Sequence, residues 1–134
     1  MKRIEATIKP FTLDPVREAL KDIGVDRFSA TEVKDFGNPD ATELYRGTQY
    51  SIDFAPRIKI EITVPDELVE SVIQTIVSGA RTKMPGNGFI FVQPVEHGYT
   101  VDDGLPLNPD MSAARAGAAS RATQGRRTGP EANA

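Results

Sequence analysis

The sequence predicts one α+β domain whose elements follow the order β-α-β-β-α-β, the ferredoxin-like arrangement. Two segments alternate apolar and polar residues, as half-buried strands do. Each is followed directly by a segment whose apolar residues recur at the helical period. Two further strand-like segments complete the order. The expected strands are 3–8, 28–36, 57–64 and 89–92, and the expected helices lie within 13–23 and 69–77.

The first strand and helix have clear boundary signals. Residues 3–8 alternate, and Pro10 ends the strand. Thr12 or Asp14 can cap the helix that follows, and Gly24 ends it. The apolar stripe of this helix is Leu13, Val16, Leu20 and Ile23.

The second strand and helix repeat this pattern. Residues 57–64 alternate more sharply, and Pro65-Asp66-Glu67 then opens a helix with acidic residues at its electropositive end. The apolar stripe of this helix is Val69, Val72, Ile73, Ile76 and Val77. If both helices cover one face of the sheet, the other face carries polar and charged residues of both signs. That face therefore needs water or a partner subunit against it.

A long loop joins a strand that ends near Phe36 to one that starts near Tyr50. About a dozen residues is much more than a tight hairpin needs. The loop carries Glu43, Tyr45 and Arg46, and Tyr50 stands at its end. Tyrosine and arginine on an exposed loop are suited to contact with another molecule. We therefore predict that this loop is the surface that engages a target.

The composition is that of an ordinary soluble domain, with 134 residues, of which 26% are charged and 39% hydrophobic. There is no Cys, and His97 is the one histidine. These counts exclude a disulfide framework, a thiol nucleophile and a histidine-rich centre, and no metal is expected. No apolar run approaches a membrane span, and the N-terminus lacks a signal-peptide pattern. We expect a cytoplasmic protein that is not inserted in a membrane.

Charge is distributed unevenly along the chain. Residues 1–103 hold 12 Lys and Arg against 17 Asp and Glu, and residues 104–134 hold four Arg against two acidic residues. An acidic body argues against nucleic-acid binding, as does a sheet face without stacking aromatic residues. The 104–134 segment has too little apolar material to offset its ordering entropy, which predicts a disordered tail. The alternative is an Ala-rich helix that forms only on a partner.

Several separate blocks resemble the PII signal-transduction family. The run Lys2-Arg3-Ile4-Glu5-Ala6-Thr7-Ile8-Lys9-Pro10-Phe11 is similar to the start of family members. Further similar blocks are 31–34, 36–37, 43–47, 53–54 and 59–62. The resemblance covers roughly residues 1–95, in order and almost without gaps. It implies a PII-like domain over 1–103 and identifies the long loop, about 37–50, with the family's T-loop.

The resemblance implies a homotrimer of ferredoxin-like subunits with nucleotide sites in the clefts between them. The T-loop would project to contact a transporter or an enzyme, so the protein would be a regulator and not an enzyme. It would be cytoplasmic and recruited, where its target requires, to a membrane transporter. Tyr50 matches the tyrosine that many proteobacterial members have uridylylated; the alternative is a half-exposed tyrosine at a strand start.

The nucleotide site is transferred from the family position by position. Glycines let backbone N–H groups approach an anion closely, and a glycine-rich turn stands where members hold phosphates. The positions implied for the phosphates are Gly37, Asn38, Gly86, Asn87 and Gly88, and those implied for the adenine are Thr7, Ser29 and Val64.

This chain departs from the family at charged positions. A phosphate-binding lysine is replaced by Phe89, and two arginines after the last strand are replaced within 99–103 by residues that include Asp102 and Asp103. Fewer charge-assisted bonds disfavour ATP most. ADP or AMP is therefore the expected ligand.

A second departure lies at the base of the loop. The glutamine that ligates Mg²⁺ with ATP and 2-oxoglutarate is absent from the segment Asn38-Pro39-Asp40-Ala41. Gly37, Arg57 and Lys59 remain as a small-anion site, for which bicarbonate is a candidate. The main hypothesis is thus regulation of inorganic-carbon uptake or fixation, as in carboxysome-associated relatives. The alternative is a nitrogen-regulatory PII protein that controls ammonium transport or assimilation.

Two other classes were compared with this hypothesis. An acylphosphatase-like enzyme would need an arginine in a phosphate loop beside a positioned asparagine, and the sequence shows no such loop. A pure interaction protein would use the loop and tail without any ligand, and would show no thermal shift with nucleotides.

Overall fold

The computed structural model describes residues 1–37, 42–45, 48–51 and 54–108, and of 42–45 and 48–51 it describes the backbone alone. Asn38, Arg46 and the predicted disordered segment beyond residue 108 lie outside the described residues. The side chains of Glu43, Tyr45 and Tyr50 do so too.

The observed order confirms the predicted β-α-β-β-α-β arrangement, with a small two-stranded ribbon inserted in the long loop. The strands are β1 (Lys2–Ile8), β2 (Ser29–Phe36), β3 (Thr42–Tyr45), β4 (Thr48–Ser51), β5 (Phe54–Val64) and β6 (Gly88–Pro94). The helices are α1 (Leu13–Asp22) and α2 (Val69–Ala80), preceded by the 3₁₀ turns η1 (Pro10–Thr12) and η2 (Asp66–Leu68). No helix in the described part of the chain is long and apolar enough to cross a bilayer.

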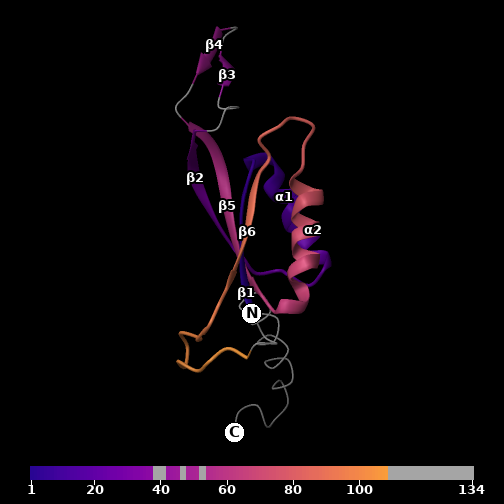
Figure 1. Ribbon diagram of the computed structural model, residues 1–134, viewed down its shortest axis with the longest axis vertical. Coiled ribbons are helices and arrows are strands. Elements are labelled where there is room, and N and C mark those ends of the chain that lie inside the picture. The colour runs from indigo at the N-terminus through magenta and orange to yellow at the C-terminus, as the bar shows by residue number, and fades with distance from the viewer. Residues whose placement is uncertain (38–41, 46–47, 52–53, 109–134) are drawn as a thin grey trace, which may run out of the picture.

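The main sheet is antiparallel throughout, with the strand order β2-β5-β1-β6. Both helices contact each other and lie on one face of this sheet (Figure 1). This order is that of the ferredoxin-like fold, which the sequence predicted.

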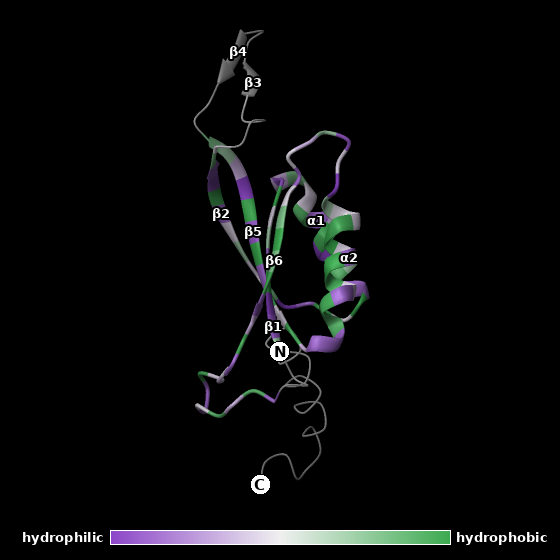
Figure 2. Cartoon of the chain, viewed as in Figure 1, coloured by the Kyte–Doolittle hydropathy of each residue, from purple (hydrophilic) through white to green (hydrophobic). Residues whose placement is uncertain are grey.

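The core lies between the two helices and the strands that they cover. Figure 2 shows hydrophobic residues along these elements. The buried side chains are Ile4, Ala6, Ile8, Val16, Leu20, Val25, Ile60, Ile62, Val64, Val72, Ile76 and Ala80. Each larger aliphatic among them stabilises the fold by about 1.5–3 kcal/mol through removal from water. One predicted stripe residue differs: Val77 is 38% exposed and Ala80 is buried instead, because α2 presents the row 72, 76, 80 to the sheet.

The ends of α1 are fixed by different means. Thr12 stands at its N-cap, but the Thr12 hydroxyl donates to the Lys9 carbonyl (2.7 Å) and not to the helix, so the predicted side-chain cap is wrong. Gly24, with φ of 84°, ends the helix. Its N–H donates to Lys21 O (3.0 Å), and the Val25 N–H donates to Leu20 O (2.9 Å), which together form a Schellman motif.

The open face of the sheet is less polar than predicted. Phe89 and Phe91 are 71% and 56% exposed on this face, with ring centroids 6.3 Å apart. The residues of β1 and β5 on the same face are Arg3, Glu5, Thr7, Arg57, Lys59, Glu61 and Thr63. The expectation of a face without aromatics is wrong because residues 89–92 are apolar without interruption. Periodicity therefore could not assign their faces, whereas pairing of Gly88 with Ile8 turns both phenylalanines away from the helices.

The long loop, residues 37–53, runs between β2 and β5. Within it β3 and β4 pair in antiparallel register, from Thr42 with Ser51 to Tyr45 with Thr48. Figure 1 shows this ribbon beyond the end of the main sheet. The prediction that Tyr50 starts a main-sheet strand is wrong: Tyr50 lies in β4, and β5 begins at Phe54, which pairs with Phe36. The tilted contact between these two rings, 5.8 Å between centroids, accompanies the longer pairing.

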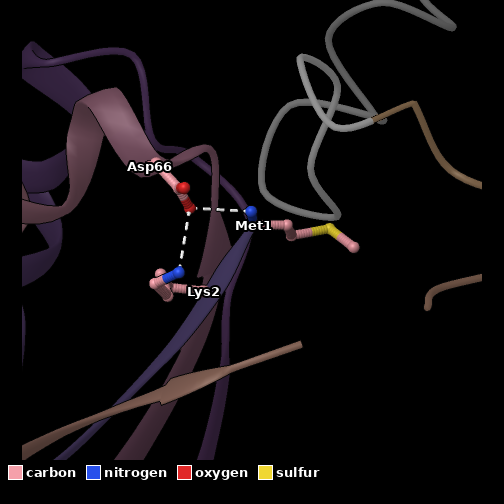
Figure 3. A network of polar contacts seen from close by, with 3 residues as sticks. All are labelled: Met1, Lys2 and Asp66. Atoms are coloured by element: carbon pink, nitrogen blue, oxygen red, sulfur yellow. Dashed lines mark hydrogen bonds and ion pairs between the residues drawn. The ribbon is translucent and has the colours of Figure 1, made fainter. Parts of the chain in front are cut away.

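The amino terminus is attached to the start of the second helical segment. The Met1 amino group lies 2.7 Å from the carboxylate of Asp66, the first residue of η2, and the Lys2 ammonium lies 3.5 Å from it (Figure 3). The amine that donates to it, helped by Lys2, lowers the pKa of Asp66 from its ordinary value of 3.8.

Candidate functional site

The turn between α2 and β6, residues 81–87, places its backbone directly against β1. Gly86 and Gly88 have φ of 77° and 120°, a region that glycine alone enters readily. A Cβ at Gly88 would lie 1.7 Å from the Thr7 carbonyl oxygen. Any other residue at Gly88 would therefore separate β6 from β1 where the strands begin to pair.

The turn is closed by hydrogen bonds between its two ends. The Thr82 N–H donates to Asn87 Oδ1 (3.1 Å), and Asn87 Nδ2 donates to the Thr82 carbonyl (3.2 Å). The Thr82 hydroxyl lies 2.5 Å from Asn87 Oδ1 and 3.1 Å from Met84 O. The Asn87 side chain is thus used within the turn.

Two cationic side chains hold carbonyl oxygens of the turn. Lys9, just after β1, donates to Pro85 O (3.2 Å) and to the Thr82 hydroxyl (3.1 Å). Arg57, on β5, donates to Gly86 O (3.2 Å) and to Pro56 O (2.8 Å). Arg57 is 8% exposed, and its buried Nε has no hydrogen-bond partner among the residues that the structure describes.

Two N–H groups in the middle of the turn remain available. Across the described ranges, neither the Gly86 N–H nor the Asn87 N–H donates to a protein group. The neighbouring carbonyls of Pro85 and Gly86 already accept from Lys9 and Arg57, so unpaired donors lie next to bonded acceptors. Donors on a glycine turn suit an anion.

A cavity of about 210 Å³ adjoins the turn at the C-terminal end of α2. Its lining is mostly apolar, and the residues that line it include Ile8, Ile76, Val77, Ala80, Gly88 and Ile90. Next to N–H donors, this apolar space suits a molecule that carries both a ring and an anionic group.

The predicted nucleotide residues divide into two groups within one chain. Thr7 pairs with Phe89 beside Gly88, so it lies at the turn. Val64 pairs with Lys2, whereas Thr7 pairs with Lys59, which places Val64 about 17 Å from Thr7 along the strands. Ser29 pairs with Glu61 on the outer side of β5, towards the Val64 end. Val64 is also fully buried, so its side chain is not available to a ligand in the single chain.

The predicted small-anion residues differ in their surroundings. Gly37 follows β2 with φ of 79° and open space around its Cα. Lys59 lies 3.7 Å from Glu61, so its charge is partly neutralised. Arg57 is the one of the three that is buried with an unused donor, its Nε.

The acidic residues after the last strand do not lie beside the turn in one chain. Residues 98–107 form a small hairpin, closed by the Leu107 N–H to Gly98 O (2.7 Å), beyond the opposite end of β6. The Asp103 carboxylate accepts from the Thr100 hydroxyl and from the Leu105 N–H (3.0 Å). These two donors lower the pKa of Asp103 from its ordinary value of 3.8. Asp103 therefore closes the hairpin and, within one chain, lies away from the turn.

Sequence reasoning missed Lys9 and Thr82 as residues of the site. Lys9 follows the alternating strand directly, and Thr82 stands five residues before Asn87. A cation at a strand end and a hydroxyl before a glycine turn are weak signals. Their convergence depends on pairing of β6 with β1.

Comparison with known proteins identifies the family of the chain. The family model for nitrogen regulatory protein P-II matches residues 1–104. The chain is 50% identical over 105 residues to the nitrogen regulatory protein P-II of Cereibacter sphaeroides, covering 78% of this chain and 94% of that protein. It is 53% identical over 93 residues to the nitrogen regulatory protein P-II 1 of Escherichia coli K12, covering 69% of this chain and 83% of that protein. On these matches the chain belongs to the P-II family of signalling proteins.

Proposed function

We propose that this chain is a P-II-type regulator that binds an adenine nucleotide at the turn of residues 81–87 and Gly88, and controls nitrogen transport or assimilation. The observation that supports it best is a glycine turn with free N–H donors beside an apolar cavity. Such a turn receives phosphates through its backbone, and the cavity suits an apolar ring.

Nitrogen control is favoured over inorganic-carbon control. Both relatives reported above, from Cereibacter sphaeroides and Escherichia coli K12, are named nitrogen regulatory proteins. The carbon hypothesis was based on missing charges at the site, and no relative reported above supports a link to carboxysomes or bicarbonate. We therefore adopt the alternative interpretation and retain bicarbonate only as a ligand to be tested.

Three copies are proposed to assemble through the open sheet face. Phe89 and Phe91 expose aromatic surface there beside charged residues of both signs, and burial of these rings would stabilise the assembly. The separation of Thr7 from Val64 within one chain gives a second reason. A cleft between copies would bring the turn of one subunit to the Ser29 and Val64 end of another.

ADP or AMP is proposed as the preferred nucleotide. Lys9 and Arg57 already bind carbonyls of the turn, and Phe89 supplies no charge. A charge-assisted bond contributes about 1.5–3 kcal/mol, so a triphosphate loses most when such bonds are absent. The long loop is proposed to contact a transporter or an enzyme, and recruitment to a membrane would follow from that contact.

Calorimetry on the full chain tests the nucleotide proposal with ADP, AMP and ATP, each with and without Mg²⁺. Gly86→Ala is the site variant, because it strains a left-handed position within the turn. Gly24→Ala is its matched control, since Gly24 has nearly the same φ (84° against 77°) but lies at the end of α1. We expect Gly86→Ala to abolish ADP binding and Gly24→Ala to retain it. Equal binding by both variants would refute the turn as the site.

The same titrations, repeated in the presence of 2-oxoglutarate or of bicarbonate, separate the two signalling interpretations. Tighter nucleotide binding with 2-oxoglutarate would support nitrogen signalling. Tighter nucleotide binding with bicarbonate alone would restore the carbon hypothesis. Light scattering on the same sample tests the trimer, and a monomer at micromolar concentration contradicts it.

A further inference from the structure

Two side chains of the turn form a hydrogen-bonded cluster with each other and with Lys9. We propose that Lys9, Thr82 and Asn87 form a clamp that fixes the turn before a ligand arrives. Thr82 and Asn87 are then positioning residues of the proposed nucleotide site, on which the functional part of this inference rests. Asn87 had been expected to contact the phosphates directly.

The Asn87 side-chain amide makes three hydrogen bonds, all to Thr82. Its Oδ1 accepts from the Thr82 N–H (3.1 Å) and from the Thr82 hydroxyl (2.5 Å), while its Nδ2 donates to the Thr82 carbonyl (3.2 Å). An amide can accept and donate at once, whereas a carboxylate accepts only. Asparagine thus satisfies both main-chain groups of Thr82, which an aspartate would not.

The Thr82 hydroxyl connects this pair to the sheet. It accepts from the Lys9 ammonium (3.1 Å) and lies within donor distance of Asn87 Oδ1 (2.5 Å) and Met84 O (3.1 Å). Lys9 also donates to Pro85 O (3.2 Å), in the middle of the turn. The clamp therefore joins both ends and the centre of the turn to Lys9, which follows β1.

The consequence for binding is pre-organisation. The clamp holds the two ends of the turn together while the N–H groups of Gly86 and Asn87 stay unpaired in the described structure. A turn that is already ordered loses less conformational entropy when an anion binds. Loss of the clamp should weaken binding without removing any group that touches the ligand.

The test uses the full chain with Asn87→Ala, Asn87→Asp, Thr82→Val and the conservative control Thr82→Ser. Thr82→Val keeps the shape and the main-chain bonds but removes the hydroxyl, and Thr82→Ser retains the hydroxyl. Amide hydrogen exchange of residues 82–88 is measured first, without ligand. We expect faster exchange there in the first three variants, unchanged exchange in β1 and α2, and wild-type exchange in Thr82→Ser.

Calorimetry with ADP then measures the functional effect. A hydrogen bond contributes about 1 kcal/mol net, and about 1.4 kcal/mol corresponds to a tenfold change in affinity. Thr82→Val removes the bond from Lys9 and the bond to Asn87, so we expect about tenfold weaker binding, and still weaker binding for the Asn87 variants. Thr82→Ser should bind as the wild type does. If the effect came only from the change in side-chain volume, Thr82→Ser would not bind ADP as the wild type does.

Two results overturn the clamp. Weaker ADP binding by Asn87→Ala with unchanged exchange would make Asn87 a ligand contact. Faster exchange with unchanged affinity would make the cluster irrelevant to binding. If the wild-type chain binds no nucleotide, the proposed function fails, and the exchange measurement alone still decides whether the cluster orders the turn.

Discussion

Arg57, on the strand that returns from the long loop, donates a 3.2 Å hydrogen bond to the carbonyl of Gly86 in the turn before β6. The two residues are 29 positions apart in the sequence, and the bond lies in a partly buried place. Arg57 thus joins the end of β5 that borders the long loop to the glycine turn.

Removal of Arg57 should destabilise the fold. Arg57→Ala leaves the Gly86 carbonyl without its donor, which costs about 1–3 kcal/mol for a buried group. Lys59→Ala is the matched control, because Lys59 lies on the same face of β5 but makes only a 3.7 Å contact with Glu61. Its effect should stay within about 0.5 kcal/mol, as for other surface pairs. Urea unfolding midpoints measure both, and equal shifts would contradict the role of Arg57.

Gly88→Ala should disrupt the sheet. The new Cβ would approach the Thr7 carbonyl oxygen to 1.7 Å, so β6 must move away from β1. Gly104→Ala also strains a left-handed residue (φ of 69°) but meets nothing within 4 Å, and should cost only about 1–2 kcal/mol. Thermal unfolding should show a large loss for Gly88→Ala alone, and similar midpoints for the two variants would argue against the clash.

Asp66 should contribute a pH-dependent part of the stability. Its folded-state pKa is lowered from 3.8, first by the hydrogen bond from the Met1 amino group. A lowered pKa means that the stabilisation is complete above the unfolded value and is lost as pH falls from about 3.8 through the folded value. Asp66→Asn should therefore lower the thermal midpoint at pH 6 and have little effect at the acid end.

The control for the ion pair between Met1 and Asp66 is Glu67→Gln, because Glu67 is the neighbouring acidic residue in η2. We expect no comparable pH-dependent difference from the wild type in this variant. If the thermal midpoints of Asp66→Asn and the wild type differ by the same amount from pH 6 to the acid limit, the ion pair is excluded as the cause of the difference.

A charged substitution in the exposed pair Phe89 and Phe91 should weaken self-association. Phe89→Glu places a carboxylate on the open sheet face, where we propose that copies meet. Phe11→Glu is the matched control, since Phe11 is equally exposed (72% against 71%) but lies in η1. Light scattering should show dissociation for Phe89→Glu only, and an unchanged mass for both variants would reject this face as the interface.

In samples that light scattering shows to keep the wild-type assembly, Phe89→Lys should increase affinity for nucleotides with more phosphates. A lysine beside the N–H donors of the turn could form one charge-assisted bond, worth about 1.5–3 kcal/mol, or at least tenfold in affinity. The gain should be larger for ATP than for AMP in calorimetry. An equal gain for both would mean that the added charge acts at long range and not on the terminal phosphates.

Much of the fold followed from the sequence because its strongest signals are local. The alternation in residues 57–64 and the stripe that includes Val72 and Ile76 correspond to buried faces in the structure. The start of β5 was misplaced because Phe54, Ala55 and Pro56 do not alternate, and pairing with β2 extends the strand. Tertiary pairing, which a single sequence does not display, decided that boundary.

The glycines of the candidate site could be predicted from the sequence, but the side chains that hold the turn in place could not. Gly86 and Gly88 stood out as a turn that admits an anion, and their positive φ values agree with it. Lys9 and Thr82 reach the turn only because β1, α2 and β6 meet there. The exposure of Phe89 and Phe91 was also missed. An uninterrupted apolar run does not show which of its residues face the helices, and only the pairing of β6 with β1 decides it.

The crowding of Gly88 against Thr7 determines where a reporter group can be attached. No label fits at that position, yet Met84, four residues earlier, is 68% exposed. Because the chain has no cysteine, Met84→Cys would create a unique attachment point for a fluorophore at the rim of the turn. Binding of a nucleotide at the turn could then be followed by fluorescence, in real time, without any change to the packed backbone at Gly88.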